Sequence, residues 1–367
     1  MKICYKKIAV YLLVFIAVFI VFSELVFATE FDLHLVEEEI NTLFDSDIRD
    51  SIEEYNIKAE NGKIKNITIF IKEKIRDYYK KPLNLFISLS GMTLIISIFN
   101  QFNIENTYNR ILNTIIVLGI SSIVINPIFE IIDETVRTII SYKNFSVTFL
   151  PIFSGILTYM GQPITASNFN IFLFVVINIY TQVITELFVP FLYGYISLSI
   201  VSAIDKDAKI SSLLKTLKSI FIWIISLSLT VLLGILSIQS SFSATSDGIS
   251  AKTTKFIMGS FIPIIGSGLS DLYMASQGFV NIIKNFVGNY GILISLVTVL
   301  PSFTKLFLWY VFFKLTAFFS ELFSVQQVKI VINSFTTVFE FLISVLVYIL
   351  FLVMISITLI LVCFKGV

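Results

Sequence analysis

The sequence predicts an all-α fold: a polytopic membrane helical bundle with about seven transmembrane helices, two broken or re-entrant segments and a candidate internal repeat. Three observations support this. The 367-residue chain is 56% hydrophobic and only 14% charged, whereas soluble domains carry roughly 25% charged residues. Several apolar runs approach the roughly 20 residues needed to cross a bilayer. An apolar Leu-Gly-Ile motif occurs twice, each time followed by a segment interrupted by proline and glycine.

Composition also excludes several functions. The net charge of +1 argues against a nucleic-acid partner, which would require a dense basic surface. Cys4 and Cys363 lie at opposite ends, and His34 is the single histidine, so we expect no disulfide framework, no metal site and no cofactor. The sequence contains no Walker loop, nucleophile elbow or pair of catalytic carboxylates, so we expect a non-enzyme.

The N-terminal region divides into two parts. Residues 1–28 resemble a signal peptide: lysines precede the apolar run Ile8–Phe22, and small residues end at Ala28. Residues 29–82 are expected to form an extracytoplasmic region of two amphipathic helices. Because this region is too small to bury a core of its own, its apolar faces should lie on the membrane surface or on another protein.

Residues 83–367 are expected to form the multi-pass transmembrane domain. The basic loop Asp205–Lys218 is predicted to lie inside the cell, and Lys365 falls on the same side in this topology. The seven candidate crossings are Leu83–Phe99, Ile111–Ile125, Phe169–Val201, Leu217–Ile238, Phe286–Leu300, Leu306–Phe323 and Val338–Phe364.

Two segments look too short and broken to cross as straight helices. Segment 145–161 and segment 256–268 each follow one copy of the Leu-Gly-Ile motif, at Gly119 and Gly234, which suggests parallel repeats over 111–201 and 219–323. Backbone freed by proline and glycine cannot face lipid, so these segments should line a path or form interfacial hairpins. The candidate residues are Pro151, Gly155, Gly161, Pro163, Gly259, Pro263, Gly266 and Gly268.

Ionisable residues within spans are the second signal, because they are costly in lipid and tend to face the bundle interior. Glu186, Lys314 and Glu321 are the candidates, and Glu186 lies four residues before Pro190, where a kinked helix with a carboxylate could serve ion coupling. Glu186 could equally extend to the headgroup layer, which is the interpretation that we prefer for Glu340.

A long block of the sequence resembles the stage III sporulation protein AE family. Its parts are Leu229–Gln239, then Thr245–Phe256, then Gly259–Gly266, and the order of signal, extracytoplasmic region and spans also matches. The resemblance implies an integral subunit of a channel between mother cell and forespore, located in the mother cell membrane around the forespore. It also implies partners: an ATPase-like cytoplasmic protein, ring-forming proteins between the membranes and a forespore membrane protein, besides the lipid bilayer. The alternative is an ion-coupled small-solute transporter acting on its own.

Overall fold

The computed structural model describes residues 65–100, 106–204, 208–261 and 266–363, and every element in these ranges is a helix. The signal peptide and most of the extracytoplasmic region lie outside these residues. The helices are α4 (Lys65–Tyr78), α5 (Lys80–Phe99), α6 (Asn106–Tyr159), α7 (Pro163–Val183), the π-helix η1 (Ile184–Phe188), α8 (Val189–Ile204), α9 (Ala208–Phe261), α10 (Gly266–Leu322) and α11 (Gln326–Cys363).

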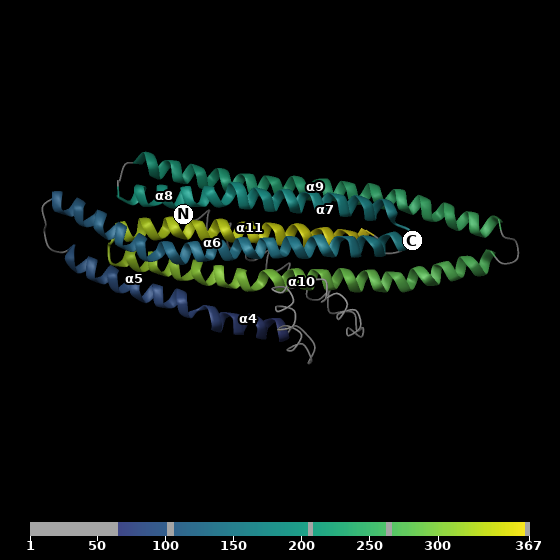
Figure 1. Cartoon of the computed structure of the whole chain (residues 1–367), viewed down its shortest axis with the longest axis horizontal. Helices are drawn as coiled ribbons and strands as arrows, with labels where there is room; N and C mark the ends of the chain where they lie inside the picture. Colours follow the sequence, from purple (N-terminus) through teal and green to yellow (C-terminus); the bar gives the residue numbers. More distant parts are fainter. Residues whose placement is uncertain (1–64, 101–105, 205–207, 262–265, 364–367) are drawn as a thin grey trace.

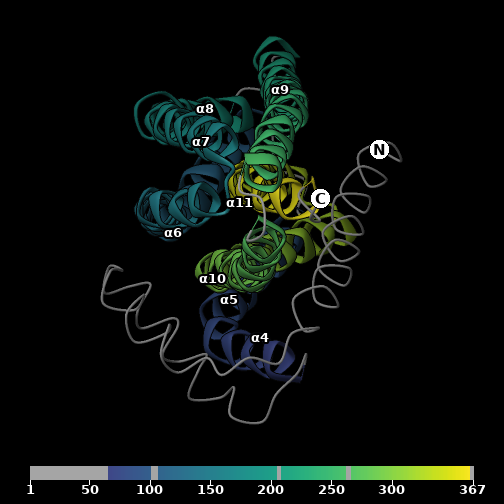
Figure 2. The same cartoon turned by 90° about the vertical axis from the view of Figure 1, so that its right-hand side faces the viewer.

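The helices lie side by side along one long axis, with α11 in the middle of the bundle (Figures 1 and 2). The α6 helix, the α7–η1–α8 rod, α9 and α10 surround α11, while α4 and α5 lie outside α10. Sequence accounts for the position of α11, since residues 341–363 carry no charge and many of their side chains are fully buried. The all-α polytopic bundle predicted from sequence is confirmed.

The helices are longer and fewer than the sequence predicts. The described residues contain six candidate spans, where the sequence suggests about seven. Segments Phe286–Leu300 and Leu306–Phe323 are parts of one helix, α10. Segment 145–161 is no separate re-entrant element either, because α6 continues through Pro127 and Pro151 to Tyr159.

Packing explains why α6 does not break. A proline inside a helix removes one hydrogen bond and can be tolerated where neighbouring helices stabilise the chain. The Pro151 ring is exposed, while Leu150 and Phe153 beside it are fully buried against the other helices. The 54 residues of α6 therefore form a rod about 80 Å long.

Polar contacts tie the outer helices to α11 within the apolar part of the bundle. The Tyr180 hydroxyl of α7 donates to the Val345 carbonyl oxygen of α11 at 2.6 Å, and its ring stacks on that of Tyr348 at 4.6 Å between centroids. The Tyr348 hydroxyl in turn shares a hydrogen bond of 2.8 Å with Ser228 of α9. One aromatic pair thus connects three helices.

Chain direction tests the predicted topology in part. The helices α6, α9 and α11 run the same way along the bundle, so α11 ends at the opposite end from the connection between α8 and α9 (Figure 1). Lys365, expected on the same side as the basic loop, therefore follows a helix that ends on the other side. The parallel direction of α6 and α9 agrees with parallel repeats, but Gly119 lies near the start of α6 and Gly234 at the middle of α9. The repeat stays a prediction.

Two connections close with the same turn. After α6, the Gly161 N–H donates to the Thr158 carbonyl and the Gln162 N–H to the Leu157 carbonyl, each at 3.0 Å. Gly161 has φ of 78°, the left-handed conformation that this helix ending requires. Ser324 closes α10 in the same way with φ of 57°.

Substitutions at these two turns should change the free energy of unfolding in opposite directions. Gly161→Ala should lower the free energy of unfolding by about 1 kcal/mol, because a Cβ opposes the left-handed conformation. Ser324→Gly should raise it by about 0.5–1 kcal/mol for the same reason. Denaturant titration of the purified chain in detergent, followed by circular dichroism, measures both. A shift in the same direction for the two variants would contradict this account.

Candidate functional site

Charged side chains meet in a belt that crosses the bundle. We define the polar belt as Lys81, Glu130, Glu134, Lys218, Lys305, Lys314 and Glu340. Its ion pairs join α5 to α6 through Lys81–Glu130, α6 to α10 through Glu134–Lys305, and α9, α10 and α11 to one another through Glu340. Charged groups are costly in lipid unless they are paired or reach water, so the belt satisfies each charge with a neighbouring helix.

Glu340 is the centre of the belt. Its carboxylate contacts the Lys218 ammonium of α9, and its other oxygen lies 3.4 Å from the Lys314 Nζ of α10. The Glu340 side chain is only 12% exposed. The Glu340 carboxylate faces the bundle interior, and its place at the headgroup layer stays a prediction, since the uncharged stretch of α11 begins directly after it.

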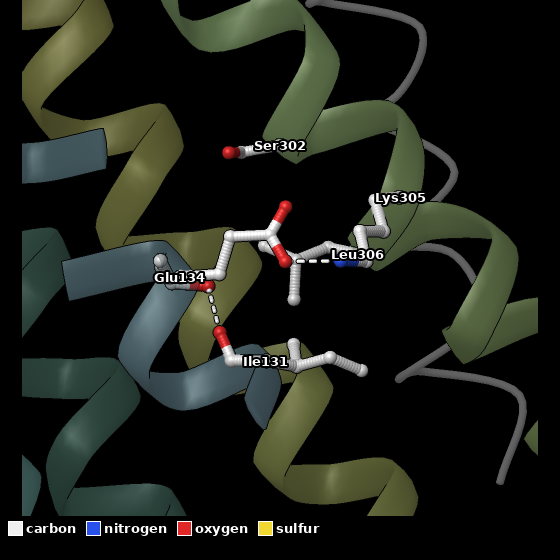
Figure 3. A pocket seen from close by; sticks show the side chains of 6 residues that line it. Ile131, Glu134, Ser302, Lys305 and Leu306 are labelled. Atoms are coloured by element: carbon white, nitrogen blue, oxygen red, sulfur yellow. Dashed lines mark hydrogen bonds and ion pairs between the residues drawn. The ribbon is translucent and has the colours of Figure 1, made fainter. Parts of the chain in front are cut away.

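A small hollow opens beside the second ion pair of the belt (Figure 3). The Glu134 and Lys305 side chains point toward each other from α6 and α10, and Ser302 lies one helical turn away on α10. The Ser302 hydroxyl shares a hydrogen bond with that of Thr138 on α6. Ile131, Thr135 and Leu306 complete the lining, and the hollow leaves no room for a water molecule.

An uncharged level begins on one side of the belt. We define it by the charge-free stretches 144–159 of α6, 163–185 of α7 and η1, 219–246 of α9, 285–304 of α10 and 341–363 of α11. The stretch of α10 between Lys284 and Lys305 spans about 30 Å, which matches the hydrocarbon core of a bilayer. On the other side of the belt, α9, α10 and α11 carry Lys209, Lys215, Glu321 and Lys329.

The three ionisable residues singled out from sequence have different surroundings. Lys314 belongs to the belt, and Glu321 pairs with Lys329 across the turn between α10 and α11. Glu186 lies in η1 and is exposed, with both carboxylate oxygens 3.3 Å from the Gln182 amide nitrogen. Pro190 follows this π-helix, so the local irregularity expected there is present.

The residues of the two suspected broken segments lie at helix ends or on helix surfaces. Pro151 and Gly155 are exposed on α6, Gly161 closes the turn after it, and Pro163 is the first residue of α7. Gly259 lies in the last turn of α9, and Gly266 and Gly268 in the first turn of α10. Pro263 lies outside the described residues.

Asp247 of α9 fixes the start of α7 near this turn. Its carboxylate accepts hydrogen bonds from the backbone N–H groups of Ile164 at 3.2 Å and Thr165 at 2.8 Å. The residue that precedes α7, Gln162, makes no capping bond of its own. Asp247 is 2% exposed and thus caps a neighbouring helix from inside the bundle.

Sequence reasoning missed the belt members Glu134, Lys305 and Lys218. Lys305 was placed in a loop between two spans, and Lys218 in the basic loop that orients the chain. A carboxylate and a lysine within long apolar helices were the available signal, but their pairing depends on which helices are neighbours. Among the described residues, no group of three or more His, Cys, Asp or Glu side chains could hold a metal ion.

Comparison with known families identifies the chain. The family model of stage III sporulation protein AE matches residues 46–363. The chain belongs to the stage III sporulation protein AE family. Membership implies a role in sporulation, and six apolar helices among the described residues indicate a multi-pass membrane protein.

A curated relative agrees with the family assignment. The chain is similar to stage III sporulation protein AE of Bacillus subtilis (strain 168), with 26% identity over 214 residues. The match covers 58% of this chain and 54% of the relative, so it spans about half the length of that protein. No solved structure matches the chain.

We predict that Glu340→Ala destabilises the protein more than Lys218→Ala does. Removing Glu340 leaves two lysines facing each other across the bundle, whereas removing Lys218 leaves the Glu340–Lys314 pair intact. The difference should be about 1–3 kcal/mol, at the lower end of what breaking a buried pair costs because the lysines are partly exposed. Denaturant unfolding in detergent measures this difference. Equal losses of unfolding free energy for the two variants would contradict an arrangement in which Glu340 pairs with both lysines.

Asp247→Ala should lower the free energy of unfolding by about 1–2 kcal/mol, because it leaves the α7 N–H groups without an acceptor. Thr245→Ala is the matched control, since Thr245 is exposed on the same helix and its hydroxyl donates to the Ser241 carbonyl oxygen one turn earlier. Thermal unfolding in detergent compares them. Identical melting of the two variants would show that the cap contributes nothing.

Proposed function

We propose that this protein is an integral membrane subunit of the intercellular channel between mother cell and forespore, needed for late forespore development during endospore formation. The match to the stage III sporulation protein AE family over residues 46–363 carries the proposal. In this role the chain resides in the mother cell membrane surrounding the forespore. Its partners are the other subunits of the channel complex and the lipid bilayer.

The geometry of the bundle supports a membrane subunit with an internal polar contact surface. Six candidate spans provide the membrane anchorage, and the polar belt holds charges inside the bundle. The ion pairs of the belt hold four long helices in register, and such pairs cost desolvation free energy unless both partners are well placed. The belt therefore supports a multi-helix membrane subunit whose interior can accommodate polar groups.

The alternative, an ion-coupled small-solute transporter acting alone, rests on the candidate repeats and on the carboxylates within the spans, among which Glu186 is the candidate for ion coupling. Its position in a π-helix favours a functional role. Its exposure and its contact with Gln182 on the same rod place the carboxylate on the surface of the bundle. We therefore prefer the channel subunit.

Gene deletion in an endospore-forming host with a late forespore reporter tests the proposal. We expect the deletion strain to complete engulfment but to lose late forespore gene expression, and the wild-type gene in the mother cell to restore it. A fluorescent fusion should surround the forespore. Normal late expression in the deletion strain would overturn the channel role, and flux by the purified chain that depends on Glu186 would favour the transporter.

A further inference from the structure

One face of α10 is polar and small across the whole uncharged level. Lys284, Gly288, Gly291, Ser295, Thr298, Ser302 and Lys305 follow one another at spacings of three and four residues, which places them on a single helix face. A lysine stands at each end. Lys284 is 1% exposed, and Lys305 pairs with Glu134 in the polar belt.

From Lys305 to Gly291, this face of α10 packs against α6 in one antiparallel register. Lys305 contacts Glu134, Ser302 contacts Thr138, and farther along Gly291 lies under the Phe149 ring. Between them lie Ser295, whose hydroxyl donates to the Gly291 carbonyl oxygen of its own helix at 2.7 Å, and the buried Tyr142 side chain of α6. We call this contact the α6–α10 seam.

Two hydroxyls in the seam have no hydrogen-bond partner within the described structure. They belong to Tyr142, whose side chain is 0% exposed, and to Thr298. A buried hydroxyl without a partner costs roughly 1–3 kcal/mol, and close packing of small residues alone would not require one. Both hydroxyls lie on the side of the seam that leads to the Glu134–Lys305 pair.

Aromatic rings close the seam beyond Tyr142. Phe145, Phe149 and Phe153 of α6 stack on one another, with 5.5 Å between successive ring centroids. A glycine is needed beneath them, since a Cβ at Gly291 would lie 2.3 Å from the Phe149 ring. At Gly288 a Cβ would lie 2.7 Å from Leu361 of α11. Rings packed on bare backbone leave no space for water at this point.

We propose that the α6–α10 seam is the closed state of a path for water and small hydrated ions through this single chain. The Glu134–Lys305 pair forms its mouth, and the hydroxyls of Ser302, Thr298, Ser295 and Tyr142 form a polar vestibule. The Phe145–Phe149–Phe153 stack is the gate, and Lys284 lies beyond it. Apolar constrictions of this kind block ions by excluding water. This path would give the proposed channel role a route through the chain, and its purpose in the cell rests on that proposed role.

Removal of the central gate ring tests the path directly. The purified full-length chain is placed in phospholipid vesicles loaded with potassium chloride, and potassium efflux is followed with an electrode. We expect Phe149→Ala to raise the efflux rate about tenfold over the unmodified chain, because the vestibule then continues past Gly291. Phe174→Ala is the matched control, since Phe174 is 46% exposed on the outer face of α7. Its vesicles should stay as tight as those of the unmodified chain.

The gate is overturned if Phe149→Ala keeps the helix content and elution volume of the unmodified chain and its vesicles leak no faster than those of Phe174→Ala. A second measurement leaves Phe149 in place. In a chain carrying Cys4→Ser and Cys363→Ser, Ser295→Cys and Val299→Cys are treated with a charged, membrane-impermeant thiol reagent; both positions are fully buried. We expect Ser295→Cys to react about tenfold faster, because water enters the vestibule but not the neighbouring buried face of α10. Equal reaction rates also overturn the path.

The two proposals can fail separately. If the Phe149→Ala chain restores late forespore expression in the deletion strain but conducts no potassium, the path is refuted and the channel-subunit proposal stands. If the chain conducts through the seam but its deletion leaves late expression normal, the channel-subunit proposal is refuted and the path stands.

Discussion

The structure depends on one constraint: a charged side chain among apolar helices needs an opposite charge from a neighbouring helix. Glu340 meets this constraint for two lysines at once, and Glu134 meets it for a third. These contacts set the relative depth of α6, α9, α10 and α11. On one side of the belt, α9, α10 and α11 can then each carry an uncharged stretch long enough for a hydrocarbon core.

The length of the helices follows from this arrangement. Lys305 would end a span if it faced lipid, but its pairing with Glu134 allows α10 to continue from Gly266 to Leu322. Buried apolar neighbours hold α6 together through Pro151 in a comparable way. The same two helices form the polar seam, so the pairs that permit long helices also bring hydroxyls and glycines together inside the bundle.

Polar groups elsewhere in the bundle serve structure. The Tyr180–Tyr348 stack with its hydrogen bonds, and the cap of α7 by Asp247, each join separate helices and leave their polar atoms paired. Among the described residues, buried polar atoms without a partner also occur outside the seam, for example at Ser121 and Thr165. The seam differs because the Tyr142 and Thr298 hydroxyls follow one antiparallel contact that also holds glycines and an ion pair. That alignment is the reason to assign a transport role to the seam and a structural role to the other contacts.

Local patterns predicted much of the architecture. The hydrophobic composition and the apolar runs predicted an all-helical membrane bundle, and the block around Gly234 predicted the family. Pro190 and Glu186 marked an irregular helix, which is present as η1. The predicted break at Pro151 was wrong because proline weakens a helix only by a few kcal/mol, and packing from other helices outweighs it.

The sequence by itself determined the chemistry available at each position: which stretches can enter lipid, where charges interrupt them and where glycine permits close approach. Only the tertiary structure decided which groups meet. Lys305 and Glu134 are 171 residues apart, and Gly291 and Phe149 are almost as distant. Their pairing depends on the register of two long antiparallel helices, which is set by side-chain packing over their full contact and is not encoded in either segment alone.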